Sequence, residues 1–314
     1  MLLIIIKIYK NVVRLIDSLY YNILMSVLAI IGGSGLYDLK KLGDSEELDM
    51  QTAWGKPSDK ILELNTYNKT TYFLPRHGRG HSINPSNINY RANIDALKQL
   101  GVTDVVSISA VGSLKKEIEP GSFVIINQYI DKTFKRTNTF FDEDLIAHVS
   151  LAKPNSASLE KVCSEILTNR NYDYHENITY VAIEGPQLST IAESRLHHIQ
   201  GFDVVGMTNM PEARIAREAE IRYQSIGMVT DYDAYNLEDD FIDVSKIIEV
   251  MKQMTGKAEN IIKDLIESYD MYSSDDDPIL TCLDQSIVSD LDKVSNETKQ
   301  NLSFILRRYM KKKN

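Results

Sequence analysis

Seven short runs of apolar, largely β-branched residues constrain this chain more than any other feature of its sequence. The runs do not alternate between apolar and polar positions, as a strand with one face in water would. Continuous runs of this length are typical of strands that are buried on both faces of a central sheet. They lie at Val27–Ile31, Thr71–Leu74, Val105–Ile108, Phe123–Ile126, Thr179–Ile183, Val204–Met207 and Ile226–Thr230.

Helical periods lie between and after these runs. Apolar residues recur at helical spacing over Leu159–Leu167, and over Ile94–Leu100 before Gly101, which is a typical helix stop. We expect a long helix over Val244–Tyr269 and one further helix over Asn296–Met310. Alternating strands and helices predict an α/β fold, a single domain in which helices flank a central mixed β-sheet.

The two ends of the chain differ from the part between them. Charged side chains interrupt residues 1–25 well before the ~20 apolar residues that a membrane span requires. We therefore expect an N-terminal extension over 1–25, with Met25 as a candidate start and a surface-bound amphipathic helix as the alternative. The domain is expected over 26–272. The turn signal SSDDDP then opens a C-terminal extension over 273–314, a linker followed by a helix.

Composition narrows the function classes. The net charge of -9 and the pI of about 5.3 argue against nucleic acid as a partner, because an acidic surface repels phosphate backbones. The two cysteines, Cys163 and Cys282, lack the spacing of a disulfide framework or a structural metal site. We expect a cytoplasmic protein with a small-molecule substrate, no membrane partner and no metal.

The first candidate site residues form the turn Gly32–Gly35 after the first apolar run. Its backbone amides and the Ser34 hydroxyl could hold a phosphate, and a tight turn without a ligand is an equal alternative. A dinucleotide-binding oxidoreductase is disfavoured, because Asp38 stands where the third glycine of GxGxxG belongs.

The segment Pro75–His81 follows the second apolar run and holds two arginines and two histidines, Arg76, His77, Arg79 and His81. Arginine binds phosphate through two parallel hydrogen bonds, and histidine can donate to it or relay a proton. We interpret the segment as a cationic cluster for an anion, with a solvated loop as the alternative.

Three more strand ends carry candidate residues. Ser109–Ser113 is a predicted turn of small residues. Small residues at this point could contact a ligand or let the backbone pack closely. Glu184 could bind sugar hydroxyls or cap the following helix. Asp231 and Asp233 lie two residues apart after the last apolar run, where carboxyl groups could bind the ring nitrogens and amino group of a purine. An Asx turn is the alternative for this pair, and metal ligands at suitable spacing are missing.

These segments, in this order, resemble the trimeric purine nucleoside phosphorylases, and most closely the branch that acts on 5′-methylthioadenosine. The resemblance covers roughly residues 26–270. The segments that carry it are IIGGSGLYD (30–38), TAWGKPSD (52–59), LPRHGRGHSINPSNINYRANI (74–94), SAVGSLKKEIEPGSFVIINQYIDKT (109–133), IEGPQLSTIAES (183–194), GMTNMPEARIAREAEI (206–221) and MVTDYDAY (228–235).

The resemblance implies a phosphorylase-like fold and a set of site residues. It implies phosphate binding by Ser34, Arg76, His77, Ser109, Ala110 and Thr208, and ribose contact by Met207 and Thr208. Asp231 and Asp233 would face the purine as catalytic groups together with His77, and His148 would line the 5′-substituent pocket of a neighbouring subunit in a homotrimer. Leu188 and Tyr235 depart from the family, which usually has Phe and Trp at these positions.

The implied activity is that of a pentosyltransferase in purine and methionine salvage. It would convert 5′-methylthioadenosine and phosphate to adenine and 5-methylthioribose 1-phosphate, with inorganic phosphate as co-substrate and no cofactor. The alternative within the family is a phosphorylase of the 6-oxopurine nucleosides inosine and guanosine. A dinucleotide-binding oxidoreductase is the alternative from another class.

Overall fold

The computed structural model describes residues 26–33, 36, 39–236, 244–269 and 277–313. The expected extension over 1–25, Ser34 and most of the expected linker lie outside these residues. Nine strands form one mixed sheet with the order β2-β3-β4-β1-β5-β8-β7-β6-β9. The strands are β1 (Leu28–Gly32), β2 (Asp44–Leu48), β3 (Ile61–Thr66), β4 (Lys69–Pro75), β5 (Asp104–Ser113), β6 (Phe123–Asp131), β7 (Tyr174–Ala182), β8 (Val204–Gly206) and β9 (Arg222–Tyr232).

Part of the sheet closes on itself. β5 pairs in parallel with β9 in addition to its neighbours in the strand order, so that β5, β8, β7, β6 and β9 form a ring. The register of the β5–β9 pair shifts between Val111 and Gly112, so that Val111 pairs with Val229 but Gly112 pairs with Asp231. Such a bulge changes the direction of the side chains that follow it, and here it precedes Asp231.

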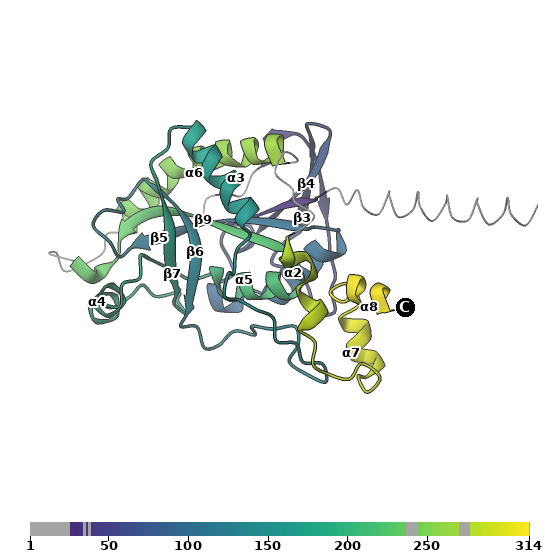
Figure 1. Cartoon of the computed structure of the whole chain (residues 1–314). Coiled ribbons are helices and arrows are strands. Elements are labelled where there is room, and N and C mark those ends of the chain that lie inside the picture. Colours follow the sequence, from purple (N-terminus) through teal and green to yellow (C-terminus); the bar gives the residue numbers. More distant parts are fainter. Residues whose placement is uncertain (1–25, 34–35, 37–38, 237–243, 270–276, 314) are drawn as a thin grey trace, which may run out of the picture.

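Helices cover both faces of the sheet, as the continuous apolar runs predict. In β1, Leu28 and Ile30 pack into the cluster that contains α3 (Ala157–Asn169) and α6 (Val244–Ser268). Ala29 and Ile31 pack on the opposite face, with α2 (Tyr90–Gln99) and α5 (Asn209–Glu218). Figure 1 shows these two helix pairs on opposite sides of the strands, and the predicted α/β fold is confirmed.

Two expectations about local structure are wrong, and two strands were missed. Ser109–Ser113 is not a turn, because β5 continues to Ser113 inside the closed part of the sheet, where small residues let strands approach closely. The helix expected over Asn296–Met310 is broken into α7 (Asn296–Asn301) and α8 (Arg307–Lys313). The hairpin strands β2 and β3 were not expected at all.

The C-terminal elements pack on the main body of the protein. Leu283 in the short helix η5 (Pro278–Gln285), and Leu302, Ile305 and Tyr309 near α7 and α8, belong to the same core cluster as α2 and α5. The remaining elements are α4 (Ile191–Ile199) and the short helices η1 (Lys40–Leu42), η2 (Pro85–Asn87) and η3 (Ala234–Asn236). Among the described residues, no helix is long and apolar enough to span a bilayer.

Candidate active site

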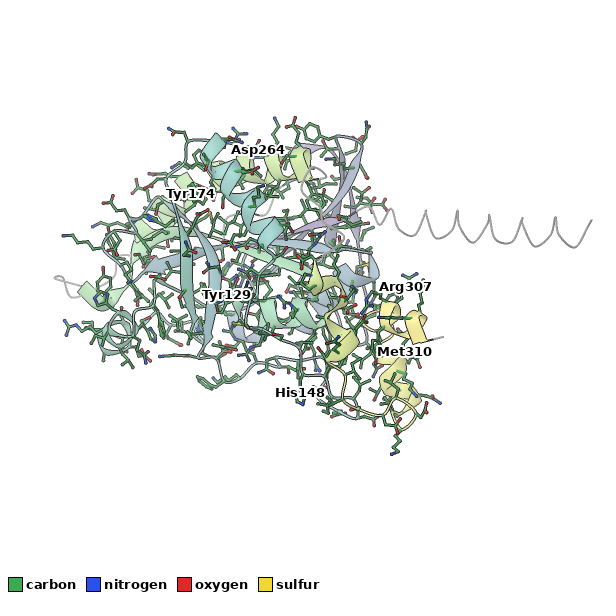
Figure 2. The ribbon with its side chains drawn as sticks, viewed as in Figure 1. Tyr129, His148, Tyr174, Asp264, Arg307 and Met310 are labelled. Carbon is green, nitrogen blue, oxygen red and sulfur yellow. The ribbon has the colours of Figure 1, made fainter. Side chains whose placement is uncertain are left out.

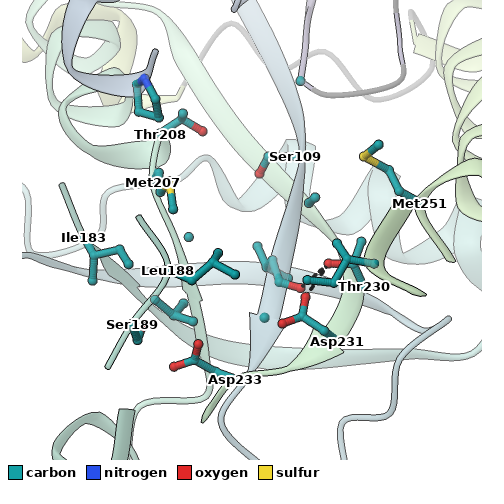
Figure 3. A pocket seen from close by; sticks show the side chains of 18 of the residues that line it. Ser109, Ile183, Leu188, Ser189, Met207, Thr208, Thr230, Asp231, Asp233 and Met251 are labelled. Carbon is teal, nitrogen blue, oxygen red and sulfur yellow. Dashed lines mark hydrogen bonds between the residues drawn. The ribbon is translucent and has the colours of Figure 1, made fainter. Parts of the chain in front are cut away.

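A cavity of about 240 Å³ opens where β1, β4, β5 and β9 end beside the end of β8. Figure 3 shows Ser109 and Thr208 at one end of this pocket, and Asp231 and Asp233 at the other. The lining residues are Gly33, Arg76, His77, His81, Pro85, Ser109, Ala110, Val111, Gly112, Ile183, Leu188, Ser189, Val205, Gly206, Met207, Thr208, Thr230, Asp231, Asp233, Ile247 and Met251.

The pocket thus brings together nearly all of the candidate residues from the sequence. Arg76, His77, Ser109, Ala110, Leu188, Met207, Thr208, Asp231 and Asp233 all line it. Ser34 lies outside the described residues. His148 does not line the pocket of its own chain: its side chain is exposed, and its backbone N–H donates to the Ser286 carbonyl beside the C-terminal elements (Figure 2).

Arg76 dominates one end of the pocket. Its side chain is fully buried, and its Nε and Nη2 donate to the two carboxylate oxygens of Glu212 at 2.7 and 3.0 Å. Nη1 has no hydrogen-bond partner among the described residues, and neither has the buried Ser109 hydroxyl. A Cβ on Gly33 would lie only 3.0 Å from Nη1, so glycine at this position leaves room in front of the guanidinium. Two unsatisfied buried polar groups at one point are what an anion-binding site needs.

His77 is a neutral group, which corrects the expectation of a cationic cluster. Its Nδ1 lies 2.9 Å from the Ile83 carbonyl, which can only accept, so Nδ1 carries the proton and Nε2 is an acceptor. Burial, and then the charge of Arg76, lowers the pKa of His77 to about 3. His81 stacks on His77 at 4.2 Å. Arg79 does not line the pocket and pairs instead with Glu47 and Asp59.

Two aspartates dominate the other end of the pocket. Asp231 accepts a hydrogen bond from the Thr230 hydroxyl at 2.6 Å, and Asp233 is buried with its Oδ2 unpartnered among the described residues. Burial raises the pKa of Asp231 to about 6, and the neighbouring Asp233 contributes to the rise. A carboxyl group with this pKa can carry a proton near neutral pH and give it to a ligand.

Several lining residues were missed in the sequence. Ser189 next to Leu188 presents a buried hydroxyl without a partner among the described residues, and only its place in the EGPQLS segment pointed to it. Ile247 and Met251 lie one turn apart on α6 and form an apolar wall. Nothing in the sequence indicated that this distant helix reaches the pocket. Glu184 does not line the pocket, and the capping residue of α4 is Thr190.

No group of three or more His, Cys, Asp or Glu side chains suited to hold a metal ion occurs in the described part of the chain. The polar groups of the pocket therefore describe a site with two ends. One end offers donors to an anion, and the other offers carboxyl groups to a ring with nitrogen atoms. The space between them is lined by apolar side chains.

Comparison with known proteins agrees with this geometry. The sequence profile of the Phosphorylase superfamily matches residues 27–267. The S-methyl-5′-thioadenosine phosphorylase of Cereibacter sphaeroides is 47% identical over 240 residues, which are 76% of this chain and 83% of that protein. The enzyme of the same name from Geobacter sulfurreducens is 41% identical over 285 residues, or 90% of this chain and 99% of that protein.

Solved structures give the same result. The crystal structure of a methylthioadenosine phosphorylase from an antarctic soil metagenomic library superposes with a TM-score of 0.84 at 39% identity, covering 90% of this chain and 99% of that one. A variant of the Schistosoma mansoni adenosine/methylthioadenosine phosphorylase, in complex with methylthioadenosine, gives a TM-score of 0.74 at 30% identity, covering 90% and 98%.

Proposed function

The chain belongs to the phosphorylase superfamily, and from this premise we propose that it catalyses the phosphorolysis of 5′-methylthioadenosine to adenine and 5-methylthioribose 1-phosphate. The enzyme is thus a pentosyltransferase of purine and methionine salvage. The observation that carries the proposal is the two-ended pocket, in which Arg76 and Ser109 lie opposite Asp231 and Asp233. The 6-oxopurine alternative is not favoured, because the relatives that match over most of the chain are methylthioadenosine phosphorylases.

The reaction breaks the bond between C1′ and N9 and forms a bond between C1′ and a phosphate oxygen. As the bond to adenine lengthens, the ribosyl group becomes positively charged, and a phosphate held by Arg76, Ser109 and Thr208 stabilises this charge and then attacks C1′. Hydrogen phosphate can donate its O–H to the neutral Nε2 of His77 in a hydrogen bond, and it releases this proton to solvent once the ester has formed, because a group with a pKa of about 3 does not hold the proton.

Adenine leaves with a proton, which balances the one lost by phosphate. Asp231 is the group that we assign to donate it at N7, because its raised pKa of about 6 keeps part of the population protonated near neutral pH. The unpartnered Oδ2 of Asp233 then accepts from the 6-amino group. Hypoxanthine has an oxygen at this position, and facing it with a carboxylate would place two acceptors together, which favours adenine.

The apolar wall of Ile247 and Met251 supports a thioether at the 5′ position. A 5′-hydroxyl placed against these side chains would lose its hydrogen bonds to water, whereas a methylthio group loses none.

The experiment that tests the function measures adenine release from 5′-methylthioadenosine with and without phosphate, and hypoxanthine release from inosine alongside. We expect adenine release that requires phosphate and little cleavage of inosine. Preferential cleavage of inosine would contradict the assignment of Asp233.

We also propose a cytoplasmic homotrimer in which His148 lines the 5′-substituent pocket of a neighbouring subunit. The exposure of His148 outside its own pocket, and the exposed apolar side chains of Phe134 and Ile199, support an interface. Light scattering should then give three times the chain mass of 35.7 kDa. His148→Ala should raise KM for 5′-methylthioadenosine severalfold without changing adenine binding. A monomer with full activity would contradict this arrangement.

Leu188→Phe should tighten adenine binding. Leu188 lines the pocket with an apolar side chain, and an aromatic ring there could stack on the base. Stacking contributes ~0.5–1.5 kcal/mol, so calorimetry should show a dissociation constant for adenine lower by roughly 2- to 10-fold. The control is Leu196→Phe, which places the same ring on an exposed position of α4 outside the pocket. Weaker binding by Leu188→Phe would mean that this position does not face the base.

A further inference from the structure

Arg136 is a buried arginine outside the pocket whose role neither the sequence nor the mechanism above explains. It lies in the loop after β6, where Phe134 is 76% exposed, yet its own side chain is 1% exposed. Its guanidinium is surrounded by main-chain carbonyls rather than by solvent. Such a side chain, with five N–H donors in a fixed plane, can hold several segments in one geometry.

The segments that Arg136 joins are two walls of the pocket. Nη2 donates to the carbonyls of Ile183 and Glu184 at 3.3 and 2.7 Å, just after β7. Nη1 donates to the carbonyl of Met207 and, at 2.8 Å, to that of Met210, just after β8. β7 and β8 are parallel neighbours with Ala182 opposite Gly206, so the guanidinium bridges the two strands directly beyond their last paired residues.

The residues on either side of these carbonyls line the pocket. Ile183, Met207 and Thr208 lie along one side of it in Figure 3. The Thr208 backbone N–H also donates to the buried Tyr180 hydroxyl at 3.0 Å. Thr208 is therefore held by Tyr180 and, through the carbonyls of Met207 and Met210, by Arg136. The position of the Thr208 hydroxyl therefore depends on the guanidinium.

Glu184 fixes the loop that carries Arg136. Its carboxylate lies 3.3 Å from Arg136 Nε and accepts from the backbone N–H groups of Phe134 and Lys135 at 2.7 and 3.2 Å. Burial would raise the pKa of Glu184, but these hydrogen bonds, one from Ser86 and the charge of Arg136 outweigh it and lower that pKa to about 2. The Glu184 carboxylate is thus ionised at neutral pH, where it pairs with Arg136.

We propose that Arg136 is a positioning residue, which holds the Met207–Thr208 segment where it meets ribose and phosphate in the transition state. This inference rests on the proposed function. Among the described residues, Arg136 has no hydrogen bond to β9, which carries Asp231, or to Asp233 directly after that strand, so we expect the adenine end of the pocket to be independent of it. Its loss should reduce catalysis and phosphate binding while adenine binding remains.

The test compares Arg136→Lys and Arg136→Met with the parent enzyme. Lysine keeps the charge but cannot reach both strand ends, so both variants should lower kcat/KM for 5′-methylthioadenosine by about 10²-fold, as small misplacements of reacting groups do. Inorganic phosphate should no longer raise the melting temperature of the variants, whereas calorimetry should give an adenine dissociation constant close to that of the parent.

The matched control is Arg217→Lys. Arg217 also donates to main-chain carbonyls, those of Ser150, Lys153 and Pro154, but these do not line the pocket. We expect it to change stability and leave the rise in melting temperature caused by inorganic phosphate unaltered.

Three results would overturn the proposal, and a fourth would contradict the proposed function alone. Parental kcat/KM in Arg136→Lys, or equal losses of adenine and phosphate binding, would overturn the positioning role. An equal loss of phosphate binding in Arg217→Lys would also overturn it. A parent protein that binds phosphate and adenine but releases no adenine from 5′-methylthioadenosine would contradict the proposed function alone, and phosphate binding by the variants would still decide the role of Arg136.

Discussion

Arg76→Met should lower kcat/KM for 5′-methylthioadenosine by at least about 10³-fold, since it removes both a charge and the Nη1 donor from the anion end of the pocket. The substitution should also destabilise the protein. It leaves the buried Glu212 carboxylate without its cation, and breaking a buried ion pair in this way costs about 3–5 kcal/mol. Steady-state kinetics and denaturant unfolding measure the two effects separately.

A second substitution separates the chemistry of Arg76 from its role in folding. Arg76→Met combined with Glu212→Gln removes both charges, while the amide can still accept from the hydroxyls of Ser107 and Tyr223, which donate to Glu212 at 2.8 Å each. We expect the double variant to recover most of the stability and none of the activity. Recovery of activity in the double variant would show that Arg76 serves the fold rather than the anion.

Asp231→Asn should lower kcat/KM by about 10²–10⁴-fold, the usual contribution of a general acid. The amide has nearly the same shape, and its oxygen can keep the hydrogen bond from Thr230. It cannot deliver a proton to the departing adenine. Kinetics with 5′-methylthioadenosine measure the loss. The control is Asp49→Asn, at an exposed aspartate outside the pocket, which should leave activity unchanged.

The same substitution should make the protein more stable at high pH. The pKa of Asp231 is raised from 3.8 to about 6 by folding, so the native state binds the proton more tightly than the unfolded state. The wild type therefore loses stability as the pH rises from about 4 to about 6, by up to about 3 kcal/mol, and does not regain it above this range. Asp231→Asn lacks this loss. The difference in unfolding free energy between the two proteins should therefore change between pH 4 and pH 8. The same difference at both pH values would contradict the raised pKa.

Much of the fold could be predicted because its strands are buried on both faces. Each of the seven apolar runs overlaps an observed strand. β2 was not predicted because its sequence DSEEL is polar and largely exposed at the edge of the sheet. It therefore lacks the apolar run by which a buried strand is recognised. The residues of Ser109–Ser113 are small because the ring of strands is closed there, and the sequence alone could not distinguish this from a turn.

In the site, too, some residues could be predicted from the sequence and others could not. Arg76, Thr208 and Asp231 could be found because each lies at or near a strand end within a motif, and Ser109 because it directly follows an apolar run. Their partners could not be found. Glu212 is separated from Arg76 by 136 residues, and the hydrogen bond that makes His77 neutral comes from a main-chain carbonyl, which no residue type reveals. The burial of Arg136 depends on a loop path that local sequence does not determine.

In the proposed reaction phosphate, rather than water, takes the ribosyl group. The most direct test follows the reaction by phosphorus NMR, with 5′-methylthioadenosine in excess over inorganic phosphate and adenine measured in the same samples. We predict a new phosphate-ester resonance that grows as inorganic phosphate disappears, with one adenine released for each phosphate consumed. Adenine release that leaves the inorganic phosphate signal unchanged would show hydrolysis and contradict the account.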